Sequence, residues 1–187
     1  MQEKREQEKQ TQEVQVQKAQ TQKAQTQKVQ AADRKNEQTQ QLLLQMQERT
    51  QVAEVLKTND YTEKFGLTLT KQDALMLVKA RGEALREQRR VEFCEGILPK
   101  LIFAFCDSDF IEQEQFAETL ERLQEIFYLY KNESMDELTD DELIRFMREK
   151  YDGECQGSLE YLEETVLDEF ARKIRSSTRK YIGRYKK

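Results

Sequence analysis

One loop of the chain carries oxygen-bearing side chains at the spacing of a calcium site. From Asp152 the sequence DGECQGSLEYLE has Asp at the first position, Glu154 at the third, Gln156 at the fifth, glycine at the sixth and Glu163 at the twelfth. An EF-hand loop needs oxygen ligands at alternate positions, a glycine for the sharp turn and a bidentate carboxylate at the twelfth position. One hypothesis is therefore a calcium site with Asp152, Glu154, Gln156 and Glu163 as ligands.

Several features of the sequence count against that calcium site. Gln156 is neutral where Asp or Asn is preferred, and Glu154 is longer than the usual Asp. EF-hands normally pair, but the stretches that follow Asn59, Asp107 and Asn132 all lack glycine at the sixth position. A plain turn between two helices, in which Gly153 and Gly157 end one helix and form the turn, explains the same residues. The calcium site is therefore the alternative interpretation of this loop.

Residue types needed for catalysis are scarce. The chain has no histidine, which removes the commonest general base, the Cys–His pair and every histidine-bearing metal site. It contains no P-loop or GxGxxG pattern, and Cys94, Cys106 and Cys155 lack the CxxC spacing of thiolate zinc sites. Acidic pairs such as Asp140 and Asp141 match a solvated helix face. We therefore expect no enzyme, no catalytic residue and no cofactor.

Charge is segregated along the chain although the net charge is only −5. Residues 92–170 hold 23 acidic and 6 basic side chains, whereas residues 171–187 hold 8 basic and no acidic ones. The basic end could bind nucleic acid or an anionic surface, or it could complement the helix dipole and fold onto the acidic body. The candidate contacts in this basic end are Arg172, Lys173, Arg175, Arg179, Lys180 and Arg184.

The N-terminal tail repeats every five residues, with TQEVQ, VQKAQ, TQKAQ and TQKVQ running from Thr11 to Gln30. A helix turns about 100° per residue, so this period spreads Val and Ala around the axis and leaves no apolar stripe. Such a segment buries too little surface to offset its ordering entropy. We predict a low-complexity, Gln/Lys-rich tail over 1–40, disordered or transiently helical, and a folded domain over 41–187. A solvated helical extension or a glutamine-driven self-association tract is the alternative for the tail.

An all-α fold is predicted from the 36% charged residues, the one proline and the six glycines. Five to six helices should pack as a bundle. The expected helices cover about 42–59, 71–89, 99–105, 107–130, 139–151 and 158–174, the fourth of them opened by the cap residues Asp107, Ser108 and Asp109. Pro99 suits the first turn of the third helix, which we expect at the centre of the core.

Short-range patterns refine these helices. Thr70 with Asp73, and Thr139 with Glu142, resemble capping boxes. The longest helix carries a heptad-like seam, which leaves Gln124 off the buried face, where truncation should be nearly silent. The seam consists of Phe116, Leu120, Leu123, Phe127 and Tyr130, and the last helix, capped by Ser158, has a continuous face of Leu159, Leu162, Val166, Phe170 and Ile174.

The compartment can also be predicted from the sequence. The longest apolar stretch, 97–105, is far shorter than the roughly 20 residues needed to span a bilayer. No apolar stretch follows the charged N-terminus, so no secretory signal is expected. We predict a cytoplasmic protein with no transmembrane segment, whose scattered cysteines stay as thiols and act as small buried hydrophobes.

Three stretches resemble a known family. YTEKFGLTLTKQDALMLV, RRVEFCEGILPKLIFAFCDSDFI and DDELIRFMREKYDGECQGSLEYLEETVL resemble a family of small bacterial helical proteins described only as a domain of unknown function. The resemblance covers about residues 41–175 and omits the repeat tail. It implies a bacterial cytoplasmic helical protein and transfers no catalytic residue. The leading functional hypothesis is a non-enzymatic module that acts through contacts with a protein partner.

Overall fold

The computed structural model describes residues 39–92 and 96–184, with side chains described up to residue 176. The chain divides into two compact units, residues 1–47 and 48–187. The five-residue repeat lies outside the described residues, so its predicted disorder stays a prediction, as does the boundary predicted between residues 40 and 41. In the described part of the first unit, residues 39–47 are helical and the side chains of residues 42–44 are exposed.

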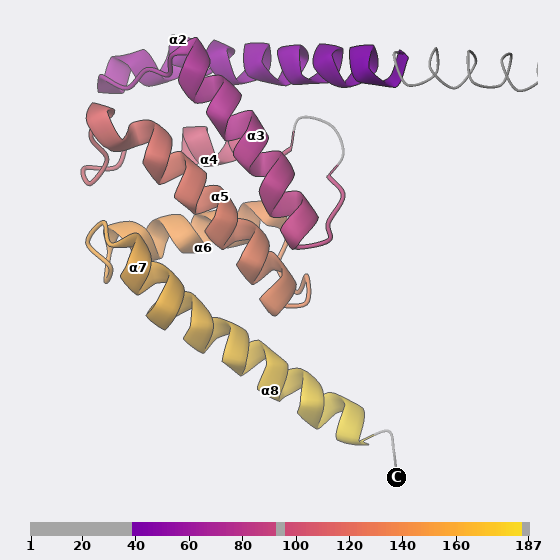
Figure 1. Ribbon diagram of the computed structural model, residues 1–187. Coiled ribbons are helices and arrows are strands. Elements are labelled where there is room, and N and C mark those ends of the chain that lie inside the picture. Colours follow the sequence, from indigo (N-terminus) through magenta and orange to yellow (C-terminus); the bar gives the residue numbers. More distant parts are fainter. Residues whose placement is uncertain (1–38, 93–95, 185–187) are drawn as a thin grey trace, which may run out of the picture. The chain divides into compact units, whose positions relative to one another are not determined.

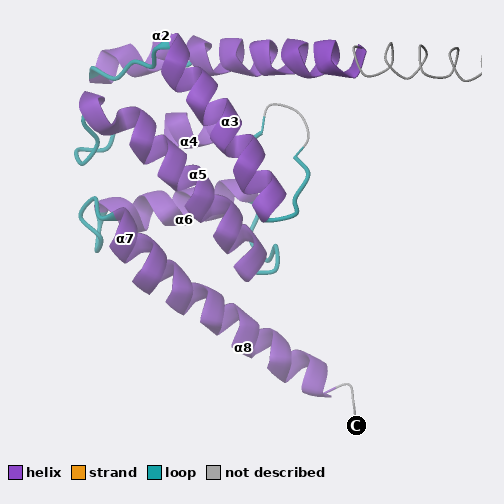
Figure 2. Ribbon diagram, viewed as in Figure 1, coloured by secondary structure: helices purple, strands orange, loops and turns teal. Residues whose placement is uncertain are grey.

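Helices make up the second unit (Figure 1). Its elements are a helix over 48–57, α2 (Asn59–Thr62), η1 (Glu63–Phe65), α3 (Lys71–Glu87), α4 (Leu98–Phe105), η2 (Gln113–Gln115), α5 (Phe116–Glu133), α6 (Asp140–Asp152), α7 (Leu159–Tyr161), a π-helix (Leu162–Leu167) and α8 (Asp168–Arg184). In the part of the chain that is drawn as helix and loop, no strand occurs (Figure 2). The predicted all-α helical bundle is confirmed.

The core forms where α4 meets α5 and α6. In Figure 1, α3 and α5 lie side by side, with α4 and α6 behind them. The α4 helix is buried over half of its length, and Pro99 occupies its first turn as predicted. The fully buried side chains of α4 are Leu98, Leu101, Ile102 and Phe105. The ring of Phe105 meets Tyr151 of α6 edge to face, with 5.6 Å between the centroids.

Both predicted capping boxes are present. The Thr70 hydroxyl accepts a hydrogen bond from Asp73 N, and the Asp73 carboxylate accepts one from Thr70 N. Thr139 and Glu142 make the same pair of bonds at the start of α6. Each box satisfies backbone amides that the helix leaves unpaired, so α3 and α6 begin where the sequence predicts.

The predicted start of the longest helix is wrong. α5 begins at Phe116, after the short η2 turn, and residues 107–109 lie in the preceding loop. The side chains of Asp107 and Ser108 bond to α6 instead of capping α5. Asp107 Oδ1 accepts a hydrogen bond from Arg148 Nη2 at 2.9 Å, and the Ser108 hydroxyl donates one to Asp152 Oδ1 at 2.6 Å.

The heptad-like seam of α5 is confirmed, but the exposed position predicted beside it is not. All five seam residues are buried. Gln124 is also fully buried, and neither its Oε1 nor its Nε2 has a hydrogen-bond partner among the described residues. The prediction failed because α5 contacts α3 as well as α4, α6 and α8, so it is buried over more than one stripe.

The last helix contains a π turn that the apolar spacing did not predict. Across Leu162–Leu167 the helix winds more widely, which shifts the buried face along the chain. Leu167, at the end of the turn, and Ala171 occupy the core, whereas Phe170 is only partly buried and its ring contacts that of Phe146, with 4.7 Å between the centroids. The Ser158 cap is confirmed, since its side chain accepts from Tyr161 N.

A helix needs both sufficient length and apolar character to cross a bilayer. Within residues 39–92 and 96–184, no helix combines the length and the apolar character needed to cross a bilayer.

Candidate functional site

The loop with calcium-like spacing places its first two carboxylates next to basic side chains. Asp152, the last residue of α6, forms an ion pair with Arg148. Glu154 forms one with Lys150, at 3.0 Å between Oε2 and Nζ. Both cations lie one helical turn before their partners, where they compete with a metal ion for the same oxygens.

The other two candidate ligands, Glu163 and Gln156, are in different elements and share no interaction partner among the described residues. Glu163 is in the π-helix, where its carboxylate pairs with Arg122 of α5. Gln156 is exposed in the loop, in a left-handed backbone conformation with φ of 48°. In the described ranges, no group of three or more Asp, Glu or Cys side chains is arranged to hold a metal ion. Calcium binding at these four residues stays the alternative hypothesis for this loop, to be tested by binding experiments.

The first basic residues of the C-terminal end interact with acidic residues of the same unit. Arg172 Nη2 lies 2.7 Å from Asp168 Oδ2, one helical turn earlier. Arg175 pairs with Glu133 at the end of α5. The side chains of residues 177–187, with Arg179, Lys180 and Arg184, lie outside the described ones, so nucleic-acid or anionic-surface binding stays a prediction.

Three aromatic rings gather on the surface beside α4, at positions that the sequence did not single out. Tyr61 of α2 contacts Phe65 of η1 at 5.8 Å between centroids and meets Phe103 of α4 edge to face at 5.4 Å. The exposed fractions of these residues are 43%, 41% and 47%. Lys64 places its ammonium 3.4 Å from the Tyr61 centroid, a cation–π contact that holds the lysine over the rings. We name Tyr61, Phe65 and Phe103 the aromatic surface.

Exposed acidic residues lie close to the aromatic surface in the chain. Asp60 and Glu63 are exposed neighbours of its rings in the chain. Asp107, which follows Phe103 by four residues and lies beyond the end of α4, is also exposed and pairs with Arg148. Burial and then the charge of Asp107 raise the pKa of the neighbouring Cys106 thiol, which keeps it protonated and unreactive at neutral pH. The aromatic surface is thus an apolar patch with a lysine over its rings, exposed acidic residues close to it in the chain, and an inert thiol three residues after Phe103.

A buried polar cluster anchors the loop between α3 and α4. The Glu92 carboxylate accepts hydrogen bonds from Arg81 Nε at 2.6 Å, from the Tyr128 hydroxyl at 2.7 Å and from Ile97 N at 2.8 Å. Burial and then the charge of Glu92 raise the pKa of Tyr128 far above its usual range, so its hydroxyl stays a donor. Gly96, with φ of 75°, packs against this cluster.

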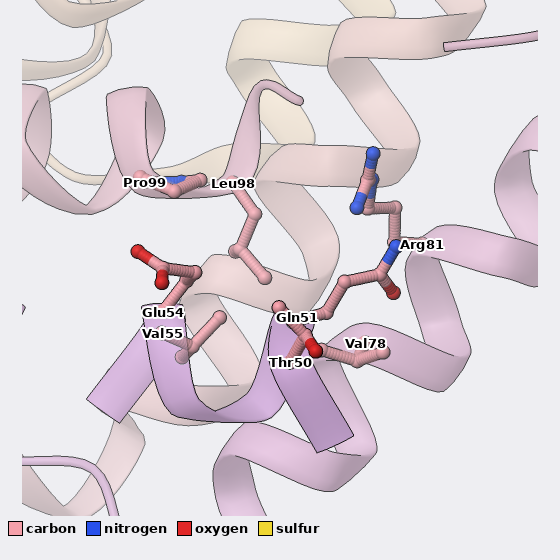
Figure 3. Close-up of a pocket in the computed structure, with 8 residues that line it drawn as sticks. All are labelled: Thr50, Gln51, Glu54, Val55, Val78, Arg81, Leu98 and Pro99. Atoms are coloured by element: carbon pink, nitrogen blue, oxygen red, sulfur yellow. The ribbon is translucent and has the colours of Figure 1, made fainter. Parts of the chain in front are cut away.

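Arg81 also forms one wall of a pocket of about 270 Å³ between the 48–57 helix, α3 and α4 (Figure 3). Pro99 lies at the α4 side of the pocket, and Phe103 of the aromatic surface lies one helical turn further along the same helix. The helix α4 therefore carries both features, the pocket near its start and the aromatic surface near its end.

Sequence signals could have revealed part of these sites. Tyr61 and Phe65 are four residues apart, which is the spacing of neighbours on a helix surface, and both follow the apolar run of the first helix. Phe103 lies about forty residues later, inside an apolar stretch that reads as core, so only packing shows that its ring faces outward. The pairing of Arg81 with Glu92 and Tyr128 is equally long-range.

Comparisons with known proteins bear on the family and not on an activity. No curated protein and no solved structure matches the chain. A family model does match it, over residues 54–180, which is more than half of its length and includes α2 through most of α8. The resemblance found in the sequence is therefore confirmed, and the chain belongs to the family described as Family of unknown function (DUF6323).

Proposed function

We propose that this protein works in the bacterial cytoplasm as a non-catalytic helical module that binds a partner protein through its aromatic surface. The observation that carries the proposal is the exposure of Tyr61, Phe65 and Phe103, each by more than two fifths, while their rings contact one another. Large aromatic side chains lose more by facing water than most residues, and they are enriched at the centres of protein interfaces.

The border of the aromatic surface favours a basic partner. Asp60 and Glu63, both exposed, are next to these rings in the chain, and the exposed Asp107 follows Phe103 by four residues. Acidic residues also outnumber basic ones by 23 to 6 over residues 92–170. A partner with lysine or arginine around its apolar contacts is steered toward such a surface, whereas an acidic partner is repelled.

Ring spacing favours an amphipathic helix as the docking segment. The centroids of neighbouring rings are 5.4 and 5.8 Å apart. Side chains three or four residues apart on a helix have Cβ atoms separated by about 5–6 Å, so two apolar residues on one helix face can each contact one ring. The proposed partner segment is a helix with apolar residues at that spacing and basic residues on either side of them.

A peptide pair tests this proposal directly. The probe is a fluorescently labelled amphipathic helix of leucine and lysine, and its counterpart carries glutamate in place of lysine. We expect the full chain to bind the lysine peptide and not the glutamate peptide, as measured by fluorescence anisotropy. Tyr61→Ala and Phe103→Ala should each weaken binding about tenfold or more, since a truncated anchor costs at least about 1.4 kcal/mol of binding free energy.

Tyr161→Ala is the matched control, because Tyr161 is 47% exposed but lies on α7, away from the aromatic surface in sequence and in ring contacts. It should bind the lysine peptide like the wild type. Capture from bacterial lysate with the same variants extends the test to natural partners. The proposal predicts a lysate protein that wild type and Tyr161→Ala retain and Phe103→Ala loses. It fails if no such protein is found, or if the lysine peptide binds all variants equally.

A further inference from the structure

The pocket beside α4 has an apolar floor and a polar rim. Val55, Val78 and Leu98 line it, and each of these residues is at most 7% exposed. In Figure 3 the side chains of Val55 and Leu98 are directed into the same space. Its remaining lining comes from Thr50, Gln51 and Glu54 on the 48–57 helix, from Arg81 on α3 and from Pro99 on α4. A floor of this kind excludes bound water, because water needs two or more polar partners.

Both charged side chains of the lining already have counterions. Arg81 Nε donates to Glu92 Oε2 at 2.6 Å, within the buried cluster. Glu54 Oε1 lies 2.6 Å from Lys57 Nζ, three residues later on the same helix. A charged ligand would lose its hydration on entering and would have to compete with one of these ion pairs. The lining therefore disfavours both anionic and cationic ligands.

The volume sets the size of a fitting ligand. A dry apolar cavity of about 150 Å³ in another protein holds benzene, which has six non-hydrogen atoms. By proportion, a pocket of about 270 Å³ holds a molecule of about ten such atoms. We propose that this pocket is a binding site for a small uncharged apolar molecule of about that size, with indole as a representative.

A second groove, on the opposite side of the 48–57 helix, differs from the pocket in having charged walls. That groove, of about 330 Å³, is larger, but Glu48, Arg49 and Lys71 form part of its walls. Ala53 lies in this groove and not in the pocket. A bulky side chain at position 53 therefore tests for an effect on the helix itself, separately from the filling of the pocket.

Titration of the full chain with three related probes tests the site. Indole is uncharged, indole-3-acetate is an anion and tryptamine is a cation, and ligand-observed NMR reports the binding of each. We expect indole to bind, and both charged probes to bind at least about tenfold more weakly. Val78→Phe, which fills the pocket from its floor, should abolish indole binding. Because Val78 is buried and its variant could misfold, Gln51→Phe fills the same pocket from the rim and should have the same effect.

Ala53→Phe is the control and should bind indole like the wild type. The inference is overturned if indole does not bind the wild type, if either charged probe binds as well as indole, or if folded Val78→Phe and Gln51→Phe both retain binding. These readouts do not involve the aromatic surface. The pocket can therefore be confirmed or rejected whatever the outcome for the partner protein.

Discussion

Replacement of Glu92 by alanine should destabilise this protein more than removal of any exposed carboxylate. Glu92 accepts three hydrogen bonds, at 2.6, 2.7 and 2.8 Å, from groups that belong to α3, α5 and the start of α4. Its side chain is 13% exposed and that of Arg81 is 7% exposed. The alanine variant would leave a buried guanidinium without its counterion and a buried tyrosine hydroxyl without its acceptor.

The magnitude follows from that burial. Breaking a buried ion pair by removing one partner costs about 3–5 kcal/mol of unfolding free energy. In a chain of this length, each kcal/mol corresponds to about 2–4 °C in Tm, so Glu92→Ala should lower Tm by about 6–20 °C. Removing both charges together is expected to cost much less than the sum of the two single changes, because no uncompensated charge is left inside.

Urea unfolding followed by circular dichroism measures these effects. The set comprises Glu92→Ala, Arg81→Met, the double variant Arg81→Met with Glu92→Leu, and Glu87→Ala as the exposed control on α3. The control should change the unfolding free energy by less than about 0.5 kcal/mol. A loss below about 1 kcal/mol for Glu92→Ala, or strict additivity in the double variant, would refute the view that this ion pair is an anchor of the fold.

Two further predictions concern backbone conformation and pH. Gly96→Ala should cost about 2 kcal/mol or more, because its φ is 75° and an added Cβ would lie 2.6 Å from Glu92 Oε2. Gly82→Ala, with no heavy atom within 4 Å of its Cβ, should instead add about 0.5–1 kcal/mol, so equal thermal shifts would contradict the structure. The hydrogen bond from Arg90 lowers the pKa of Asp136, and the stabilisation it provides is present above an unfolded pKa of about 3.9 and lost as pH falls through the lower folded pKa. The urea midpoint should therefore fall between about pH 5 and pH 2, and less steeply in Asp136→Asn. Parallel curves for the two proteins would count against this pair.

Features encoded over three or four residues were predictable from the sequence. The capping boxes at Thr70 and Thr139 were found because the hydroxyl and the carboxylate that form them are three residues apart. The seam of α5 was found because apolar spacing reports directly on one buried face. The start of α5 was not, because Asp107 and Ser108 look like caps but are used by Arg148 and Asp152, more than forty residues later.

In the candidate calcium loop, one competing interaction could be predicted from nearby residues and another could not. Its oxygen spacing is real, but Arg148 and Lys150 lie four residues before Asp152 and Glu154. That i,i+4 spacing was visible in the sequence and predicts intrahelical ion pairs as readily as metal ligands. The pairing of Glu163 with Arg122 was not visible, because it depends on how the last helix packs on α5.

At Gln124 the apolar spacing of the sequence predicts exposure, whereas the packing of α5 buries the side chain, and a substitution can test the consequence. Its side chain is fully buried, and no described residue hydrogen-bonds its amide, which leaves both polar atoms without compensation for lost water. A buried unsatisfied group costs about 1–3 kcal/mol. Methionine has nearly the same shape and no such requirement. Gln124→Met should therefore raise the unfolding free energy by about 1–3 kcal/mol. Gln113→Met is the comparison, at an exposed glutamine whose amide is paired. Gln113 Oε1 accepts from Thr68 N at 2.7 Å and Gln113 Nε2 donates to Thr68 O at 2.9 Å, so this variant should lose stability. If Gln124→Met also loses stability, the amide has a partner such as a buried water, and the position is a polar link in the core and not an unpaired one.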